Sequence, residues 1–149
     1  MRRVRLSVGF ADLTHYTKTS EVMEPEAAVL MLQERLEAAG DILVRHGCRI
    51  HKYMGDTILF ASDDVASAVQ AAREIAALPA AEICGYSVRW RVTVATGEVV
   101  ATTIGHASHR VEDILGATVN RAAMLLRDAA QSPDGVAFCP ETQQRLGAS

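Results

Sequence analysis

Aromatic side chains are scarce in this sequence. They make up 5% of its 149 residues, so the core must consist largely of Ala, Val, Leu and Ile. Basic residues are not in excess either, since 15 Lys and Arg stand against 18 Asp and Glu, for a formal net charge of -3. Proteins that bind nucleic acid duplexes usually carry a basic surplus, so this balance disfavours nucleic acid as a partner. No apolar run approaches the roughly eighteen residues of a membrane-spanning helix, and we expect no membrane partner.

Cysteine is sparse and odd in number. Cys48, Cys84 and Cys139 lie in apolar stretches. We interpret them as free thiols in a reducing compartment, which favours a cytoplasmic location. The length and the 49% apolar content suit one globule, so we expect a single domain over 1–149 with no attached regulatory domain.

The first half of the chain shows regular hydrophobic periodicity. Apolar side chains alternate over 3–12, which indicates a half-buried strand that ends at Asp12. Helical spacing follows over about 25–46 and again from Val65 to Pro79. Two short strands joined by a Gly-Asp turn are expected between these helices, over 48–53 and 57–61.

The second half predicts more strands and two further helices. The expected elements are a strand over 86–95, a turn at Gly97, a returning strand over 99–104, a polar loop over 105–110, a helix from Gly116 to about Ala130, a strand over 136–139 and a last helix from Pro140. The fold class is therefore α+β. Its ferredoxin-like βαββαβ core carries an additional C-terminal strand-helix extension, with an antiparallel-rich sheet covered by helices.

This topology brings two carboxylates together. In a split βαβ unit the third strand lies antiparallel between the first two, so the end of strand one lies beside the start of strand three. Asp12 ends the first strand and Asp56 precedes the third. Adjacent carboxylates repel each other unless a cation lies between them, and Mg²⁺ prefers oxygen ligands. The pair predicts a metal site suited to phosphoryl transfer, and the amides and hydroxyls of Leu13–Thr17 are candidates to receive phosphate oxygens.

Four segments then resemble, in order, the motifs of class III nucleotidyl cyclases. Phe10–Thr17 (FADLTHYT) resembles the first metal motif, and Lys52–Asp56 (KYMGD) the second. Thr96–Val100 (TGEVV) is similar to the Gly-Glu turn of the family, and Asp113–Asn120 (DILGATVN) to the segment that leads into its ribose-binding helix.

The resemblance implies a reaction and a set of residues. The 3′-hydroxyl of a nucleoside triphosphate would attack its own α-phosphate and release pyrophosphate. Asp12, Asp56 and the Leu13 carbonyl would hold two Mg²⁺ or Mn²⁺ ions. The substrate-binding residues implied next to them are Thr14, His15, Tyr16 and Thr17.

Base choice follows from hydrogen-bond chemistry. Lys52 is a donor that suits adenine N1, and Asp113 is an acceptor that suits the adenine 6-amino group. Guanine presents the opposite pattern, so the pair favours ATP over GTP. The family also implies that Lys52, Asp113 and Asn120 act on the nucleotide whose metals the other subunit holds, which predicts a head-to-tail homodimer with composite sites.

The pattern is broken at two places. The family arginine four residues after the helix asparagine is Met124 here, and a thioether cannot neutralise developing charge. We expect Arg127, or alternatively Arg121, to replace it, although both also fit solvated helix arginines. A triphosphate-binding lysine that the family carries further along the chain has no counterpart up to Ser149.

These departures keep three functions open. The leading one is an adenylate cyclase acting as a homodimer. The alternative is a catalytically weak or inactive cyclase-like domain that binds nucleotide or a partner for regulation. A guanylate cyclase is the third, disfavoured by Lys52 and Asp113.

Overall fold

The computed structural model describes residues 1–148. Its strands are β1 (Arg2–Leu13), β2 (Arg49–Met54), β3 (Thr57–Ser62), β4 (Ala81–Ile83), β5 (Tyr86–Val88), β6 (Trp90–His106), β7 (His109–Leu115) and β8 (Val136–Phe138). Its helices are α1 (Tyr16–Val22), α2 (Pro25–Arg45), α3 (Val65–Ala76), α4 (Ala117–Met124), α5 (Leu126–Gln131) and α6 (Pro140–Ala148).

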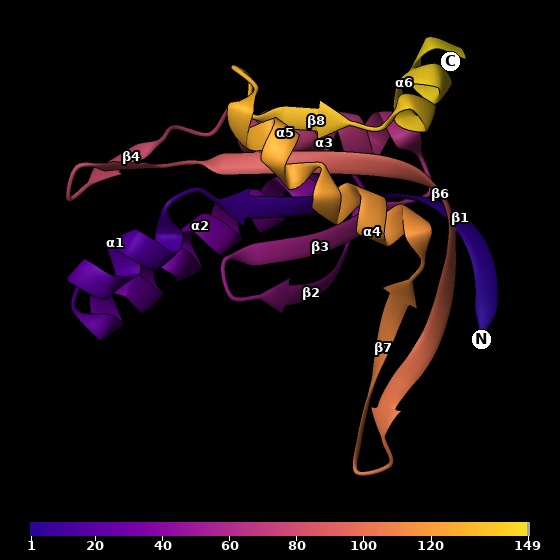
Figure 1. Cartoon of the computed structure of the whole chain (residues 1–149), viewed down its shortest axis with the longest axis horizontal. Coiled ribbons are helices and arrows are strands. Elements are labelled where there is room, and N and C mark those ends of the chain that lie inside the picture. Colours follow the sequence, from indigo (N-terminus) through magenta and orange to yellow (C-terminus); the bar gives the residue numbers. More distant parts are fainter. Residues whose placement is uncertain (149) are drawn as a thin grey trace.

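One six-stranded sheet organises the molecule, with the order β2-β3-β1-β6-β7 and with β8 parallel to β6 (Figure 1). The first four strands of this path are antiparallel neighbours, as the ferredoxin-like prediction requires. The predicted βαββαβ core is therefore confirmed. Among residues 1–148, none of the helices combines the length and the apolar character needed to cross a bilayer.

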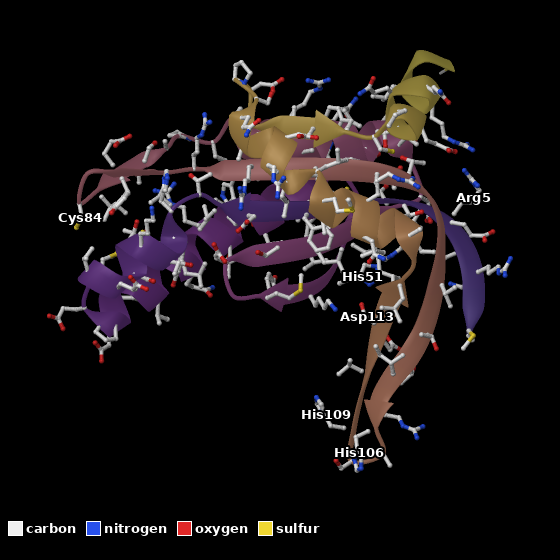
Figure 2. All side chains as sticks on the ribbon, viewed as in Figure 1. Arg5, His51, Cys84, His106, His109 and Asp113 are labelled. Carbon is white, nitrogen blue, oxygen red and sulfur yellow. The ribbon has the colours of Figure 1, made fainter. Side chains whose placement is uncertain are left out.

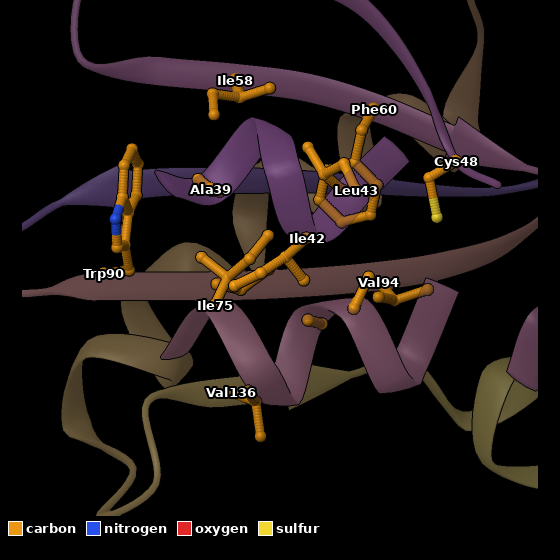
Figure 3. Close-up of a cluster of buried hydrophobic side chains, with 14 of the residues drawn as sticks. Ala39, Ile42, Leu43, Cys48, Ile58, Phe60, Ile75, Trp90, Val94 and Val136 are labelled. Carbon is orange, nitrogen blue, oxygen red and sulfur yellow. The ribbon is translucent and has the colours of Figure 1, made fainter. Parts of the chain in front are cut away.

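Both faces of the sheet are covered. On one face α2 and α3 pack on side chains such as Phe60, Trp90 and Val94 (Figure 3). On the other face α4 packs on Val8, Leu59 and neighbouring side chains. The interpretation of residues 3–12 as half-buried was wrong in this respect, because β1 is buried on both faces from Leu6 to Ala11.

The predicted turn at Gly97 was also wrong. β6 runs without interruption from Trp90 to His106, and the backbone of Gly97 is extended. The absence of a side chain serves packing, because a Cβ at Gly97 would lie 2.6 Å from the Thr118 hydroxyl of α4. This glycine lets a helix approach the strand closely and does not reverse the chain.

The predicted loop over 105–110 is the end of a hairpin. β6 and β7 pair as far as His106 and His109, joined by Ala107 and Ser108, and the resulting arm (residues 101–115) projects from the sheet (Figure 1). The β4–β5 hairpin was likewise not predicted. Its tip carries Cys84, which is exposed and not in apolar surroundings.

The expected helix from Gly116 to Ala130 is divided. α4 ends at Met124 and α5 begins at Leu126, with Leu125 between them. Asn120 therefore lies on α4 and Arg127 on α5, and the expectation that Arg127 replaces the family arginine stays a prediction.

The centre of the sheet depends on a close approach at Gly9. A Cβ added there would lie 2.2 Å from Phe60 Cζ and 2.5 Å from the backbone oxygen of Thr93. The Phe60 ring thus lies directly on the β1 backbone, which only glycine permits.

We predict that Gly9→Ala destabilises the fold by about 3 kcal/mol, because the backbone oxygen cannot move away from the new methyl group. Gly40→Ala is the matched control. Gly40 lies inside α2, where a Cβ meets only Ile50 Cδ1 at an ordinary 3.7 Å. Alanine there should stabilise the protein by about 0.5–1 kcal/mol. Urea unfolding of both variants checks the opposite signs, and equal effects would contradict the close-packing argument.

Candidate active site

The edge of the sheet where β1 ends and β3 begins holds the two predicted carboxylates. Asp12 lies opposite Thr57 in the antiparallel ladder, and Asp56 directly precedes Thr57. Thr57 Oγ1 donates a hydrogen bond to Asp12 Oδ1 at 3.2 Å. The carboxylates therefore meet as the topology predicts.

A cation from the neighbouring strand contacts this edge. Arg91, opposite Asp12 on β6, donates from Nη2 and Nε to Asp12 Oδ2 at 2.7 and 3.2 Å. Sequence reasoning missed Arg91. The signal was present, because Arg89, Arg91 and Thr93 form the polar side of the strand whose other side is Val88, Trp90 and Val92.

The titration of Asp56 reflects its surroundings. Burial, and then the charge of Asp12 and a side-chain hydrogen bond with it, raise the pKa of Asp56 to about 6. This carboxylate pair provides hard oxygen donors, and the charge of Arg91 lowers the pKa of Asp56 by less than burial and Asp12 raise it. These residues fit a divalent cation of the Mg²⁺ type. No group of three or more His, Cys, Asp and Glu side chains within residues 1–148 forms a closed metal site.

Most polar and apolar groups of the turn after Asp12 already contact the rest of the chain, which the sequence did not suggest. Thr14 donates its amide to the Arg89 carbonyl at 2.8 Å, and its hydroxyl bonds the carbonyls of Ser87 and Arg89. Tyr16 packs against the core, and Leu13 is buried. The exposed side chains of the turn are those of His15 and Thr17.

His15 has a left-handed backbone with φ 59°. This conformation favours glycine, so a histidine here is held by contacts. Its Nδ1 donates to the Ser87 carbonyl at 3.0 Å, and its ring lies 5.5 Å from the Tyr86 ring.

The two predicted base-reading residues form an ion pair. Lys52 Nζ lies 2.8 Å from Asp113 Oδ2, and Asp113 Oδ1 accepts the Ile114 amide. β2 and β7 are the outermost strands of the sheet path, so this contact closes a strongly curled sheet. Figure 2 shows His51 and Asp113 at the base of the arm. Burial and then the charge of Arg49 lower the pKa of His51.

The predicted helix residues lie apart from these contacts. Asn120, Arg121 and Arg127 are exposed, and within residues 1–148 their side chains make no hydrogen bond or ion pair. Met124 is 78% exposed. This part of the site is open in the single chain.

A comparison with protein families gives a match over nearly the whole chain. The model of the adenylate and guanylate cyclase catalytic domain matches residues 2–148. The chain belongs to this cyclase family. The resemblance seen in the four sequence motifs is thus confirmed.

Curated relatives of this cyclase domain include bacterial adenylate cyclases. The chain is 30% identical to the adenylate cyclase of Streptomyces coelicolor over 121 residues, which are 81% of this chain and 29% of the relative. It is 34% identical to the adenylate cyclase of Glutamicibacter nicotianae over 122 residues, which are 80% of this chain and 27% of that one. The chain spans under a third of the length of these relatives.

Solved structures with the same fold differ in base specificity. A bacterial light-regulated adenylyl cyclase superposes with TM-score 0.84 at 17% identity, over 97% of this chain and 80% of that chain. The guanylyl cyclase domain of the RhoGC fusion protein from Blastocladiella emersonii superposes with TM-score 0.80 at 19% identity, over 99% of this chain and 86% of that chain. The fold of this cyclase domain is therefore established, and the fold alone does not distinguish ATP from GTP.

We predict that Asp56→Asn stabilises the metal-free domain above pH 6. The pKa of Asp56 is raised, so the folded state holds its proton more tightly than the unfolded state, and stability falls as pH rises from about 4 to about 6. Asparagine has no carboxyl group to ionise, so the variant does not lose stability in this pH range. The gain should be absent near pH 4 and about 1 kcal/mol above pH 6, discounted for solvent screening of a half-exposed group.

Thermal unfolding in EDTA between pH 4 and 8 measures this gain. Asp41→Asn, at an exposed carboxylate on α2, is the control and should show no such pH dependence. A gain for Asp56→Asn that is constant with pH would contradict the carboxylate repulsion.

Proposed function

We propose that this domain is an adenylate cyclase, which converts ATP to 3′,5′-cyclic AMP and pyrophosphate. The observation that carries the proposal is the pair of contacts at the two ends of the site, with Asp12 beside Asp56 and Lys52 on Asp113. The relatives named adenylate cyclases support the same assignment.

The carboxylate edge would hold the phosphate chemistry. Asp12, Asp56 and the Leu13 carbonyl are the oxygen donors for two Mg²⁺ or Mn²⁺ ions. When bound, such ions acidify a 3′-hydroxyl and neutralise a triphosphate. Arg91, whose guanidinium lies on Asp12, is placed to donate to phosphate oxygens. In the reaction the 3′-oxygen forms a bond to the α-phosphorus, the 3′-hydroxyl loses its proton, and the bond from the α-phosphorus to the leaving pyrophosphate breaks.

The Lys52–Asp113 pair would read the base. Lys52 has donors beyond the one used on Asp113 and can serve adenine N1, and Asp113 keeps acceptor capacity for the 6-amino group. Thr14, His15, Tyr16 and Thr17 were expected to bind substrate as well. Of these, His15 and Thr17 have side chains that remain available to the triphosphate.

The active unit would be a homodimer in the cytoplasm. Apolar side chains stay exposed on the arm. Ile104 lies opposite Val111, and Leu115 lies on the same side of β7 as Val111 and Asp113. Exposed apolar side chains around a functional face are typical of an interface. A second copy covering this face would bring its own carboxylate edge to Lys52, Asp113 and Asn120.

The other two functions are distinguished by specific features. A weak or inactive nucleotide-binding domain is favoured by the uncharged Met124, and the adjacent carboxylates oppose it. A guanylate cyclase would need an acceptor for guanine N1, which Lys52 does not provide.

We expect purified protein with Mn²⁺ to form cyclic AMP from ATP and to use GTP less well. Asp12→Asn should lower turnover at least about a hundredfold, because charge stabilisation at the reacting phosphate is lost. Asp63→Asn, at an exposed carboxylate paired with Arg49, should be unchanged. Mass spectrometry of the products and the dimer state of each variant are the measurements. If protein shown to be dimeric forms no cyclic product from either nucleotide, the proposed cyclase activity is wrong.

We propose further that Arg127 supplies charge that Met124 does not, with Arg121 as the alternative. Met124→Arg should raise turnover, and Arg127→Ala should lower it by about tenfold or more, with KM for ATP little changed, if the arginine acts on the transition state. Arg121→Ala measures the alternative. Steady-state kinetics of the three variants decide between the positions, and three unchanged rates would exclude both.

A further inference from the structure

Both oxygens of the Asp12 carboxylate are already hydrogen-bonded within the chain. Thr57 Oγ1 donates to Oδ1 at 3.2 Å, while Arg91 donates to Oδ2 from Nη2 at 2.7 Å and from Nε at 3.2 Å. A guanidinium that uses two N–H groups on one oxygen is a strong, charge-assisted partner. A divalent ion that binds Asp12 Oδ2 would therefore have to share this oxygen with Arg91.

The position of the ion pair makes it resistant to solvent. Asp12 and Arg91 are opposite residues in the β1–β6 ladder, so the strand register itself brings their side chains to the same face of the sheet. The two side chains are 14% and 28% exposed, so water and salt screen the pair less than they screen an exposed ion pair. Removal of Arg91 would leave a partly buried carboxylate without its counter-charge.

Arg91 and a metal ion would serve the same purpose at this edge. The Arg91 charge lies close enough to offset part of the repulsion between Asp12 and Asp56, which is also what a bound cation does. An ion about 2 Å from Asp12 Oδ2 would lie less than about 5 Å from Arg91 Nη2, given the 2.7 Å contact. Two cations at that separation repel each other, so the contact with Arg91 and the contact with the ion oppose one another.

The Arg91 side chain has space to leave Asp12. A cavity of about 520 Å³ adjoins the carboxylate edge, and Arg91 is among the residues that line it. Asp12 is the one acidic partner of Arg91 among residues 1–148. Rotation of the side chain can thus carry the guanidinium into this space, and the release breaks a single ion pair.

We propose that Arg91 is a built-in competitor of divalent ions for Asp12, and that this competition sets the metal affinity of the domain. The proposal rests on the proposed function, because that function makes Asp12 and Asp56 metal ligands. In the metal-free domain Arg91 holds Asp12. A divalent ion has to displace the guanidinium from Oδ2 before both carboxylates can coordinate it, so Mg²⁺ or Mn²⁺ alone binds weakly.

The test measures binding of Mn²⁺ alone to the full chain, by electron paramagnetic resonance of the free ion. Arg91→Met should tighten Mn²⁺ binding by about tenfold or more, because the competing charge-assisted contact is gone. Arg91→Lys keeps the charge without the planar fork and should change the affinity less. In an Asp12→Asn background, Arg91→Met should no longer tighten binding, because the contested carboxylate is absent.

Arg89→Met is the charge-matched control. Arg89 lies two residues before Arg91, on the same side of the extended chain, and makes no ion pair with either carboxylate within the part of the chain that the structure describes. Its removal takes away the same charge from the same neighbourhood without touching the Asp12 contact. This variant should change the Mn²⁺ affinity by no more than about twofold, because solvent screens the longer interaction.

Thermal unfolding in EDTA gives a second readout with the opposite sign. Arg91→Met should lower the Tm of the metal-free domain by about 4 °C, because Asp12 loses its counter-charge beside Asp56. A merely structural role of Arg91 would lower the Tm and also weaken Mn²⁺ binding. Lower stability with tighter binding is therefore specific to competition. If Arg91→Met does not fold, Arg91→Gln serves in its place, since it keeps a donor for Asp12 without the charge.

The outcomes separate this proposal from the cyclase activity. If Mn²⁺ binding tightens in Arg91→Met and not in Arg89→Met, the competition stands even where no cyclic product forms. If Arg91→Met binds Mn²⁺ no more tightly than the wild type does, the competition is overturned, although cyclic AMP formation stands. Equal tightening in both arginine variants would also overturn it, because net charge and not the contact with Asp12 would then control metal affinity.

Discussion

The pairing of β1 with β6 is the constraint on which the rest of the molecule depends. The two strands pair without a break from Arg2 opposite Ala101 to Leu13 opposite Trp90. This register sets Arg91 against Asp12 at one end and sends β6 onward into the arm at the other. Because side chains alternate along a strand, a shift by one residue would turn both Asp12 and Phe10 away from their partners. The chemistry of the edge and the packing of the core are therefore fixed by the same ladder.

The charged residues of the carboxylate edge lie together at one end of this ladder. Asp12 and Asp56 repel each other at the end of β1, and Arg91 on β6 compensates Asp12. Adjacent carboxylate oxygens of this kind are donors that suit a divalent cation. The adjacent like charges oppose folding.

Much of the fold follows from the sequence, and the failures have physical causes. The alternation over 3–12 and the helical spacing of 25–46 gave the core elements, and the split βαβ order placed Asp12 beside Asp56. Gly97 was interpreted as a turn because glycine occurs both in turns and where another element approaches a strand closely. Only the approach of Thr118 in the structure distinguishes the two cases. Lys52 and Asp113 were assigned to the base through family resemblance, and their ion pair was not predicted. No local pattern reveals that the two outer strands meet, since this depends on the curl of the whole sheet.

The Lys52–Asp113 contact also has a consequence for biosynthesis. The two residues are 61 positions apart and belong to the outermost strands of the sheet path. A nascent chain that has emerged as far as His106 already holds β1, β2, β3 and β6, and with them Asp12, Asp56 and Arg91. It has no Asp113. Because chains fold from the N-terminus as they are made, the Asp12–Asp56 edge can assemble before the Lys52–Asp113 contact forms. The contact between the two outermost strands of the sheet path is then the last of these features that the growing domain acquires.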